Sequence, residues 1–328
     1  MTTTEAGTSE YDRFGPWIDE VRTPQDVPRL YRDHPLDLDT ARLVLKVPRN
    51  IARRDATADM DLYDHLLVLD DVGLTALSRR TGGPGTSAKD AEGYDVRVAP
   101  YRSVVALLDV VSLLDATLTI VTTDGSTLAV RYNGSARDNV RRLVDEIRAA
   151  TTVAAPSPVG RALLDAGRTA AAHSAALTLG NDDVALVSDV REVRRRLPDL
   201  TPWTWHGRRR VHPQGGGAAG VVRAAWHALS PATLHAAVLA GDDHALEIVA
   251  RHAWLVRGRA PVHSLSRLVV PLAVIDDVRV VAHPAYRDVV VATLHVGGTT
   301  LDLAVPDGSG AHHLLAGIAD RPATPRTS

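Results

Sequence analysis

The stretch from Thr117 to Ile147 constrains the fold of this chain more than any other. Apolar and polar residues alternate in two runs, one before and one after Asp124-Gly125. Strict alternation is typical of strands with one buried face, and Asp-Gly is typical of the tight turn of a β-hairpin, a type I′ turn being the expected form. The stretch therefore begins as two antiparallel strands.

A helix is predicted to follow this hairpin directly. Asn133-Gly134 ends the second strand, and Ser135 is placed to cap the helix. An apolar stripe runs along one side of the helix, made by Val140, Leu143, Val144 and Ile147. Four arginines fall on the other side, namely Arg137, Arg141, Arg142 and Arg148. Such a helix needs apolar surface to cover, so we expect its stripe to pack on the preceding strands.

A similar succession returns near the C-terminus in the same order. Six residues have counterparts 172 positions later: Leu62, Leu67, Asp70, Asp71, Leu74 and Arg79 match Leu234, Leu239, Asp242, Asp243, Leu246 and Arg251. Later matches have offsets of 167, 173 and 174: Ala106, Leu108 and Asp109 with Ala273, Ile275 and Asp276; Gly125, Thr127 and Leu128 with Gly298, Thr300 and Leu301; Gly134-Ser135 with Gly308-Ser309. Residues 60–150 and 230–320 are therefore predicted to be copies of one domain.

The hairpin, the Asn133-Gly134-Ser135 break and the arginine-bearing helix resemble the end of a bacterial pleckstrin-homology-like (PH-like) domain. The resemblance covers residues 60–150 and, more faintly, 230–320. It implies an α+β fold with two mostly antiparallel, bent sheets or partial barrels, each closed by a C-terminal helix. It also implies a binding or scaffold role. The basic first loop that reads phosphoinositides in some members is replaced here by Asp70-Asp71 and Asp242-Asp243. Because like charges repel an anionic headgroup, lipid binding is not expected.

The remaining segments complete the expected organisation. Residues 1–59 are predicted to elaborate the first domain, residues 151–229 to form a helical connector with a Trp/Arg/His loop, and residues 321–328 to be a disordered tail. The chain of 328 residues has a net charge of −2 and no Cys, which excludes disulfides and thiolate chemistry. With a polar N-terminus and no apolar run long enough for a bilayer, a cytoplasmic location is expected.

The densest group of chemically capable side chains is Trp203–His212. Its aromatic residues either anchor the loop on neighbouring helices or face a partner, and its two histidines leave open a metal or phosphate site. Nearby arginines, Arg191 and Arg194–Arg196, are interpreted as a solvated helix face. The candidate partner-binding residues are Trp203, Trp205, His206, Arg208, Arg209, Arg210, Arg137, Arg141 and Arg142.

The function predicted from sequence is a non-catalytic binding or scaffold protein that contacts a protein partner or itself. No catalytic motif, cofactor site, complete metal-ligand set or nucleic-acid signature is recognised in the sequence. The alternative is an enzyme with a site between the two domains that uses His206 and His212, with a carboxylate supplied by the fold.

Overall fold

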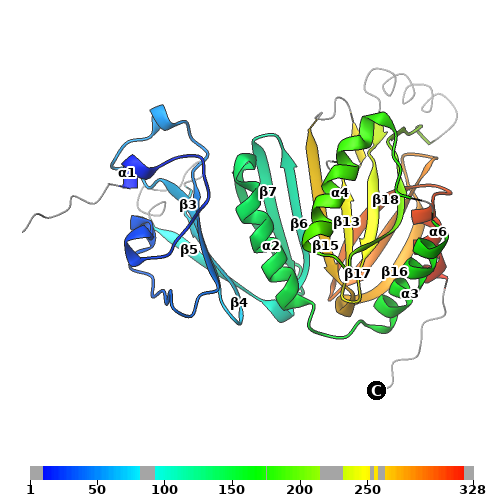
Figure 1. Ribbon diagram of the computed structural model, residues 1–328, viewed down its shortest axis with the longest axis horizontal. Helices are drawn as coiled ribbons and strands as arrows, with labels where there is room; N and C mark the ends of the chain where they lie inside the picture. The colour runs from blue at the N-terminus through cyan, green and yellow to red at the C-terminus, as the bar shows by residue number, and fades with distance from the viewer. Residues whose placement is uncertain are drawn as a thin grey trace, which may run out of the picture. The chain divides into compact units, whose positions relative to one another are not determined.

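A computed structural model describes residues 10–81, 93–174, 176–214, 232–251, 255–257 and 263–320. These residues form an α+β fold of antiparallel sheets and helices (Figure 1). The helices are α1 (Glu10–Arg13), α2 (Arg137–Thr151), α3 (Pro158–His173), α4 (Val184–Arg196) and α6 (Gly310–Ala319). The Gly215–Gly217 run, the element expected at residues 221–229 and the tail at 321–328 lie outside the described residues.

The strands of the first half are β1 (Asp19–Glu20), β2 (Leu43–Pro48), β3 (Tyr63–Leu69), β4 (Gly73–Arg79), β5 (Tyr94–Pro100), β6 (Val104–Ser112), β7 (Asp115–Thr122) and β8 (Thr127–Asn133). Those of the second half are β9 (Thr201–His206), β10 (Arg209–Arg210), β11 (Ala232–Leu234), β12 (Ala237–Gly241), β13 (Ala245–Ala250), β14 (Leu255–Arg257), β15 (Ser264–Pro271), β16 (Ile275–Ala282), β17 (Val289–Val296) and β18 (Thr299–Pro306). The sheets have the orders β1-β2-β3-β4-β5, β8-β7-β6-β15-β13-β12-β9, β16-β17-β18 and β10-β11-β14. None of these sheets closes into a barrel within the described residues.

The chain divides into two compact units. The first comprises residues 1–103, 113–118 and 128–147, and the second comprises residues 104–112, 119–127 and 148–328. The units therefore do not coincide with the halves expected from sequence, because β6 belongs to the second unit, where it pairs with β15.

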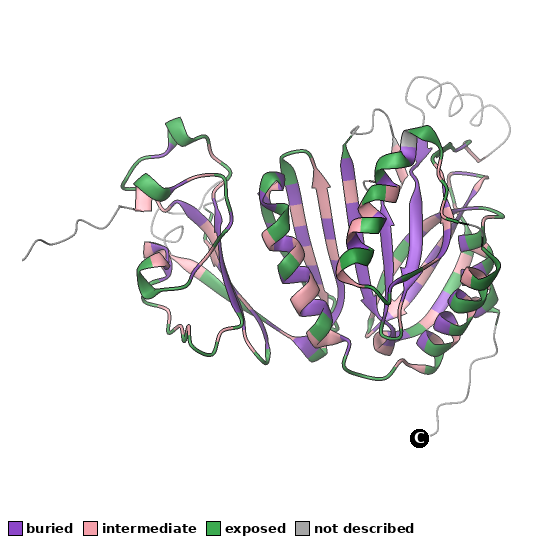
Figure 2. Cartoon of the chain, in the orientation of Figure 1, coloured by how far each residue is buried: buried purple, intermediate pink, exposed green. Residues whose placement is uncertain are grey.

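In the first unit, β2 lies within the segment expected to be an elaboration, yet it pairs with β3 and is a full member of the sheet. The N-terminal residues pack on one face of that sheet, where Phe14, Val21 and Tyr31 are buried with Leu66 and Leu77. Helix α2 has the expected apolar stripe, visible as buried residues along one side in Figure 2.

The start of α2 differs in detail from the sequence expectation. Asn133, not Ser135, supplies the cap: its side-chain oxygen accepts a hydrogen bond from the Ser135 N–H, and a short 3-10 helix at Gly134–Ala136 precedes α2. The hairpin turn is also not type I′, since Gly125 has a positive φ of 77° whereas Asp124 does not.

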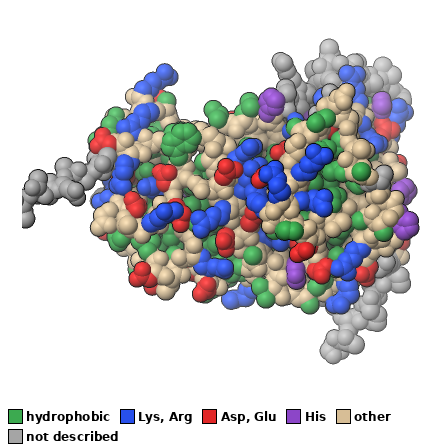
Figure 3. Space-filling view, in the orientation of Figure 1, with side chains coloured by type: hydrophobic (Ala, Val, Ile, Leu, Met, Phe, Trp, Pro, Cys, Tyr) green, Lys and Arg blue, Asp and Glu red, His purple; other side chains and the backbone are tan. Residues whose placement is uncertain are grey.

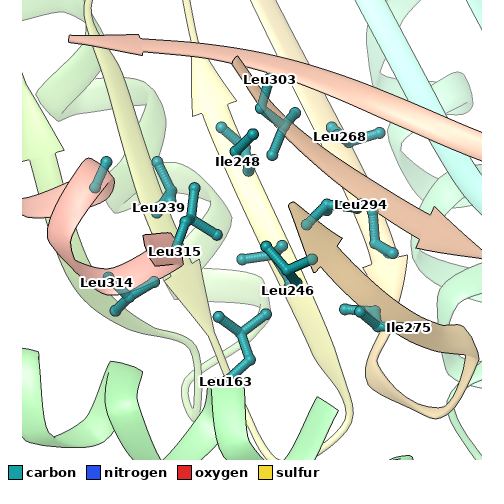
Figure 4. Close-up of a cluster of buried hydrophobic side chains, with 14 of the residues drawn as sticks. Leu163, Leu239, Leu246, Ile248, Leu268, Ile275, Leu294, Leu303, Leu314 and Leu315 are labelled. Atoms are coloured by element: carbon teal, nitrogen blue, oxygen red, sulfur yellow. The ribbon is translucent and has the colours of Figure 1, made fainter. Parts of the chain in front are cut away.

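In the second unit, strands β15, β13, β12 and β9 are covered on both faces. Helix α4 covers one face through Leu186, Val190 and Val193. The other face packs against β16–β18, α3 and α6, and Figure 4 shows how Leu246 and Ile248 of β13 meet Leu294, Leu303 and Leu315. The C-terminal helix thus closes the β16–β18 sheet, as expected for this half.

The two halves share one succession of elements. Strands β2-β3-β4-β5, a 3-10 turn at Tyr101–Ser103, strands β6-β7-β8 and α2 are matched by β9-β12-β13-β15, a 3-10 turn at Leu272–Val274, β16-β17-β18 and α6. The two 3-10 turns are 171 residues apart, so Val104 corresponds to Ile275. The offset of 167 read from Ala106, Leu108 and Asp109 is therefore wrong.

The turns after β3 and β12 match at the level of single hydrogen bonds. The Asp70 carboxylate accepts the N–H groups of Val72 and Gly73 at 2.7 and 2.9 Å. The Asp242 carboxylate accepts those of His244 and Ala245, both at 3.0 Å. These aspartates hold an Asx-type turn in each half, which is a structural reason for acidic residues there.

Candidate interaction surface

The segment expected to be a Trp/Arg/His loop is instead a strand, β9, followed by a short exposed stretch. Trp203 is fully buried in β9. Its ring lies between two glycines: a Cβ added at Gly167 of α3 or at Gly241 of β12 would come within 2.2 or 2.1 Å of it. Trp203 anchors the fold and is not available at the surface, so we remove it from the candidate contact residues.

Trp205 and His206 are also engaged by the fold. Trp205 is partly buried against the α4 side of the sheet. His206 is buried, and its Nε2 atom has no hydrogen-bond partner among the described residues. Burial lowers the pKa of His206 to about 4, so this imidazole is neutral at physiological pH.

Arg208, Arg209 and Arg210 are exposed and extend from the end of β9. The backbone N–H of Arg208 donates to the buried Asp183 carboxylate at 2.9 Å, which fixes the stretch beside the N-terminus of α4. Arg209 and Arg210 form β10, whose pairing with β11 leaves both side chains in solvent.

His212 brings a fourth arginine to the same stretch. The N–H of Arg287 donates to the His212 carbonyl at 3.1 Å, and the Arg287 side chain is exposed. His212 Nδ1 lies 2.5 Å from the Asp288 carboxylate, and this hydrogen bond is the main cause that lowers the pKa of Asp288. Sequence reasoning missed Arg287 because it is 75 residues from His212 and no local pattern marks it. We define Arg208, Arg209, Arg210 and Arg287 as the basic stretch.

The two histidines of the sequence alternative face different surroundings. His206 is buried and neutral, whereas His212 is exposed and bonded to Asp288. The fold thus supplies a carboxylate to His212 only. Among the described residues, no three His, Cys, Asp or Glu side chains are grouped so that they could hold a metal ion.

The arginines of α2 are largely used within the first unit. Arg141 pairs with Asp138 at 3.3 Å, and Arg142 pairs with Glu20 of β1 at 3.2 Å. Arg137 is exposed. The exposed arginines of α4, Arg191, Arg194 and Arg195, lie opposite its buried side as expected, and Figure 3 shows Lys and Arg side chains on the face that α4 covers.

Arg148 was expected on the exposed side of α2 but is buried in the second unit. Its Nε atom donates to Glu247 at 2.6 Å, and its Nη2 atom donates to Asp242. Arg267 donates to the same Glu247 carboxylate through two nitrogens, at 2.9 and 3.2 Å. Glu247 is fully buried. We call Arg148, Asp242, Glu247 and Arg267 the buried charge cluster.

No protein-family model, curated protein or solved structure matches this chain. The assignment of a role therefore depends on the geometry above. Among the described residues, no helix is both long and apolar enough to cross a bilayer.

Proposed function

We propose that this chain is a non-catalytic binding protein made of two PH-like repeats, and that the basic stretch binds an acidic surface of a partner protein. The repeat part of the proposal is supported by the shared succession of four strands, a 3-10 turn, three strands and a helix. That succession, with a C-terminal helix packed on the three-stranded sheet, is what the PH-like resemblance implies.

The observation that carries the binding part is the basic stretch itself. Four arginines are exposed on backbone held in place by β-pairing and by the Asp183 and Asp288 carboxylates. Guanidinium groups on fixed backbone suit bidentate contacts with carboxylates, and they lose less side-chain entropy per hydrogen bond than lysines do. An acidic protein surface is therefore the chemistry that fits.

A membrane surface is a poorer fit for these repeats. The turns after β3 and β12 carry Asp70-Asp71 and Asp242-Asp243, and Asp70 and Asp242 are held in their turns by backbone hydrogen bonds. Acidic side chains at these positions repel anionic headgroups.

The test is affinity capture from a lysate with the full chain, followed by identification of retained proteins. The variant Arg208→Glu/Arg209→Glu/Arg210→Glu is expected to lose a retained acidic partner, and raised salt is expected to weaken the wild-type interaction. The matched control is Arg54→Glu/Arg102→Glu/Arg131→Glu, which reverses three exposed charges elsewhere. Equal capture by both variants, or no salt-sensitive partner, would rule out the basic stretch as the binding surface.

A further inference from the structure

Two strand edges of this chain are open, and they are the counterparts of two strands that pair with each other. Strand β6 pairs antiparallel with β15. In the shared succession, β15 corresponds to β5 and β6 corresponds to β16. Among the described residues, no strand pairs with the outer edge of β5 or of β16. We propose that β16 of one copy of this chain pairs with β5 of a second copy, as β6 pairs with β15 inside one copy.

The exposed side chains of β5 support a docking role for that edge. Val96 and Val98 are 47% and 61% exposed. An open strand with exposed valines is a template for an added strand, and proteins usually blunt such edges. On β16, Val281 is 58% exposed.

The register of the internal pair predicts the register between copies. Pro100 and Pro271, like Val104 and Ile275, are 171 residues apart, so one shift converts both strands. The internal pair Val269–Leu107 becomes Val98–Val278, and the pair Arg267–Asp109 becomes Val96–Val280. One side of the new pair is thus apolar throughout.

The opposite side of the new pair carries charges. Leu268–Leu108 becomes Arg97–Arg279, and Ser266–Val110 becomes Asp95–Val281. Arg279 is paired with Asp277 at 3.0 Å, and Asp277 is a diagonal neighbour of Arg97 in this register, within reach of a long side chain. Asp277 therefore lies between the two guanidinium groups and offsets their repulsion.

Helix α3 does not occupy the part of β16 that pairs. Its N-terminal residue Ser157 donates to the Ile275 carbonyl at 2.5 Å. Ile275 corresponds to Val104, which lies outside the paired residues Leu107–Ser112 of β6. The corresponding residues 278–283 are the ones that would take up the second copy. This contact is head-to-tail, so each copy retains one free edge of each kind.

The experiment is sedimentation velocity on the full chain over a concentration series. We expect a mass that rises with concentration. Val281→Glu places a second carboxylate opposite Asp95 and is expected to raise the dissociation constant roughly fivefold, whereas Val281→Lys is expected to lower it by a similar factor. The matched controls are Val153→Glu and Val153→Lys, at a valine that is 82% exposed; they should change nothing.

A mixing experiment tests the head-to-tail arrangement. Val98→Glu blocks the β5 edge and leaves β16 intact, and Val281→Glu does the reverse. Each variant alone should associate weakly, while an equal mixture should stop at two chains. A wild type that remains monomeric at every concentration would overturn the proposal. So would loss of association in Val98→Glu with none in Val281→Glu, because that result indicates symmetric β5–β5 pairing. The proposal is independent of the basic stretch, so Arg208→Glu/Arg209→Glu/Arg210→Glu should associate like the wild type.

Discussion

Replacing Arg148 with Met tests the buried charge cluster most sharply. The substitution keeps much of the side-chain volume but removes two charged donors. Glu247, which is fully buried, loses the 2.6 Å hydrogen bond from Nε, and Asp242 loses its guanidinium partner. Removing one member of a buried ion pair typically costs 3–5 kcal/mol because the other charge remains buried. Arg267 still neutralises Glu247, so we expect the lower end, about 3 kcal/mol.

The measurement is the free energy of unfolding from urea denaturation. The control is Arg142→Met, which removes an ion pair to Glu20 whose arginine is half exposed, and it should cost less than about 1 kcal/mol. If Arg148→Met costs no more than Arg142→Met, the cluster is solvated in solution and the burial argument fails.

The same cluster predicts a pH dependence. Burial alone raises the pKa of Asp242, but the Arg148 charge and the N–H groups of His244 and Ala245 outweigh it and hold the pKa below the ordinary value of 3.8. A carboxyl whose pKa is depressed by folding contributes stability above its unfolded pKa, and that contribution is lost as the pH falls through the folded value. Arg148→Met should therefore flatten the loss of stability below about pH 4.

Three further substitutions test other parts of the structure. Gly167→Ala should destabilise the chain by roughly 1–3 kcal/mol because the new methyl group meets the buried ring of Trp203, and an unchanged urea midpoint would contradict the packing. Leu113→Gly should stabilise the β6–β7 turn by roughly 1 kcal/mol, since Leu113 has a φ of 56°; a thermal midpoint that falls would refute this. The lowered pKa of His206 means that folding loses stability as the pH falls from about 6.5 toward 4, so His206→Gln should remove up to about 3 kcal/mol of that acid sensitivity, whereas an unaltered pH profile would show that His206 is solvated.

The local patterns in this sequence were sufficient where structure depends on near neighbours. The alternation around Asp124-Gly125 and the stripe of α2 predicted the hairpin and the helix, because periodicity reports which side of an element is buried. The Asp70 and Asp242 turns were found through the repeat, and their matching hydrogen bonds explain why the same residue type stands in both.

Long-range contacts explain what the sequence did not predict. Arg148 was placed on the polar side of α2 by its charge, but its partners are 94 and 99 residues away. The pairing of β6 with β15 depends on which of several edges meet. Trp203 is different, since a signal was present: Thr201–His206 has the aromatic and β-branched content of a strand. Attention to the neighbouring arginines obscured it.

The central claim is that the two halves of this chain are copies of one PH-like fold. The most direct measurement is a crystal structure of the full chain in which residues 43–148 are superposed on residues 201–320. We expect the seven strands to match in order, with the turn at Tyr101–Ser103 over that at Leu272–Val274 and α2 over α6. A different strand order in the two halves, or the absence of the closing helix from either, would contradict the claim.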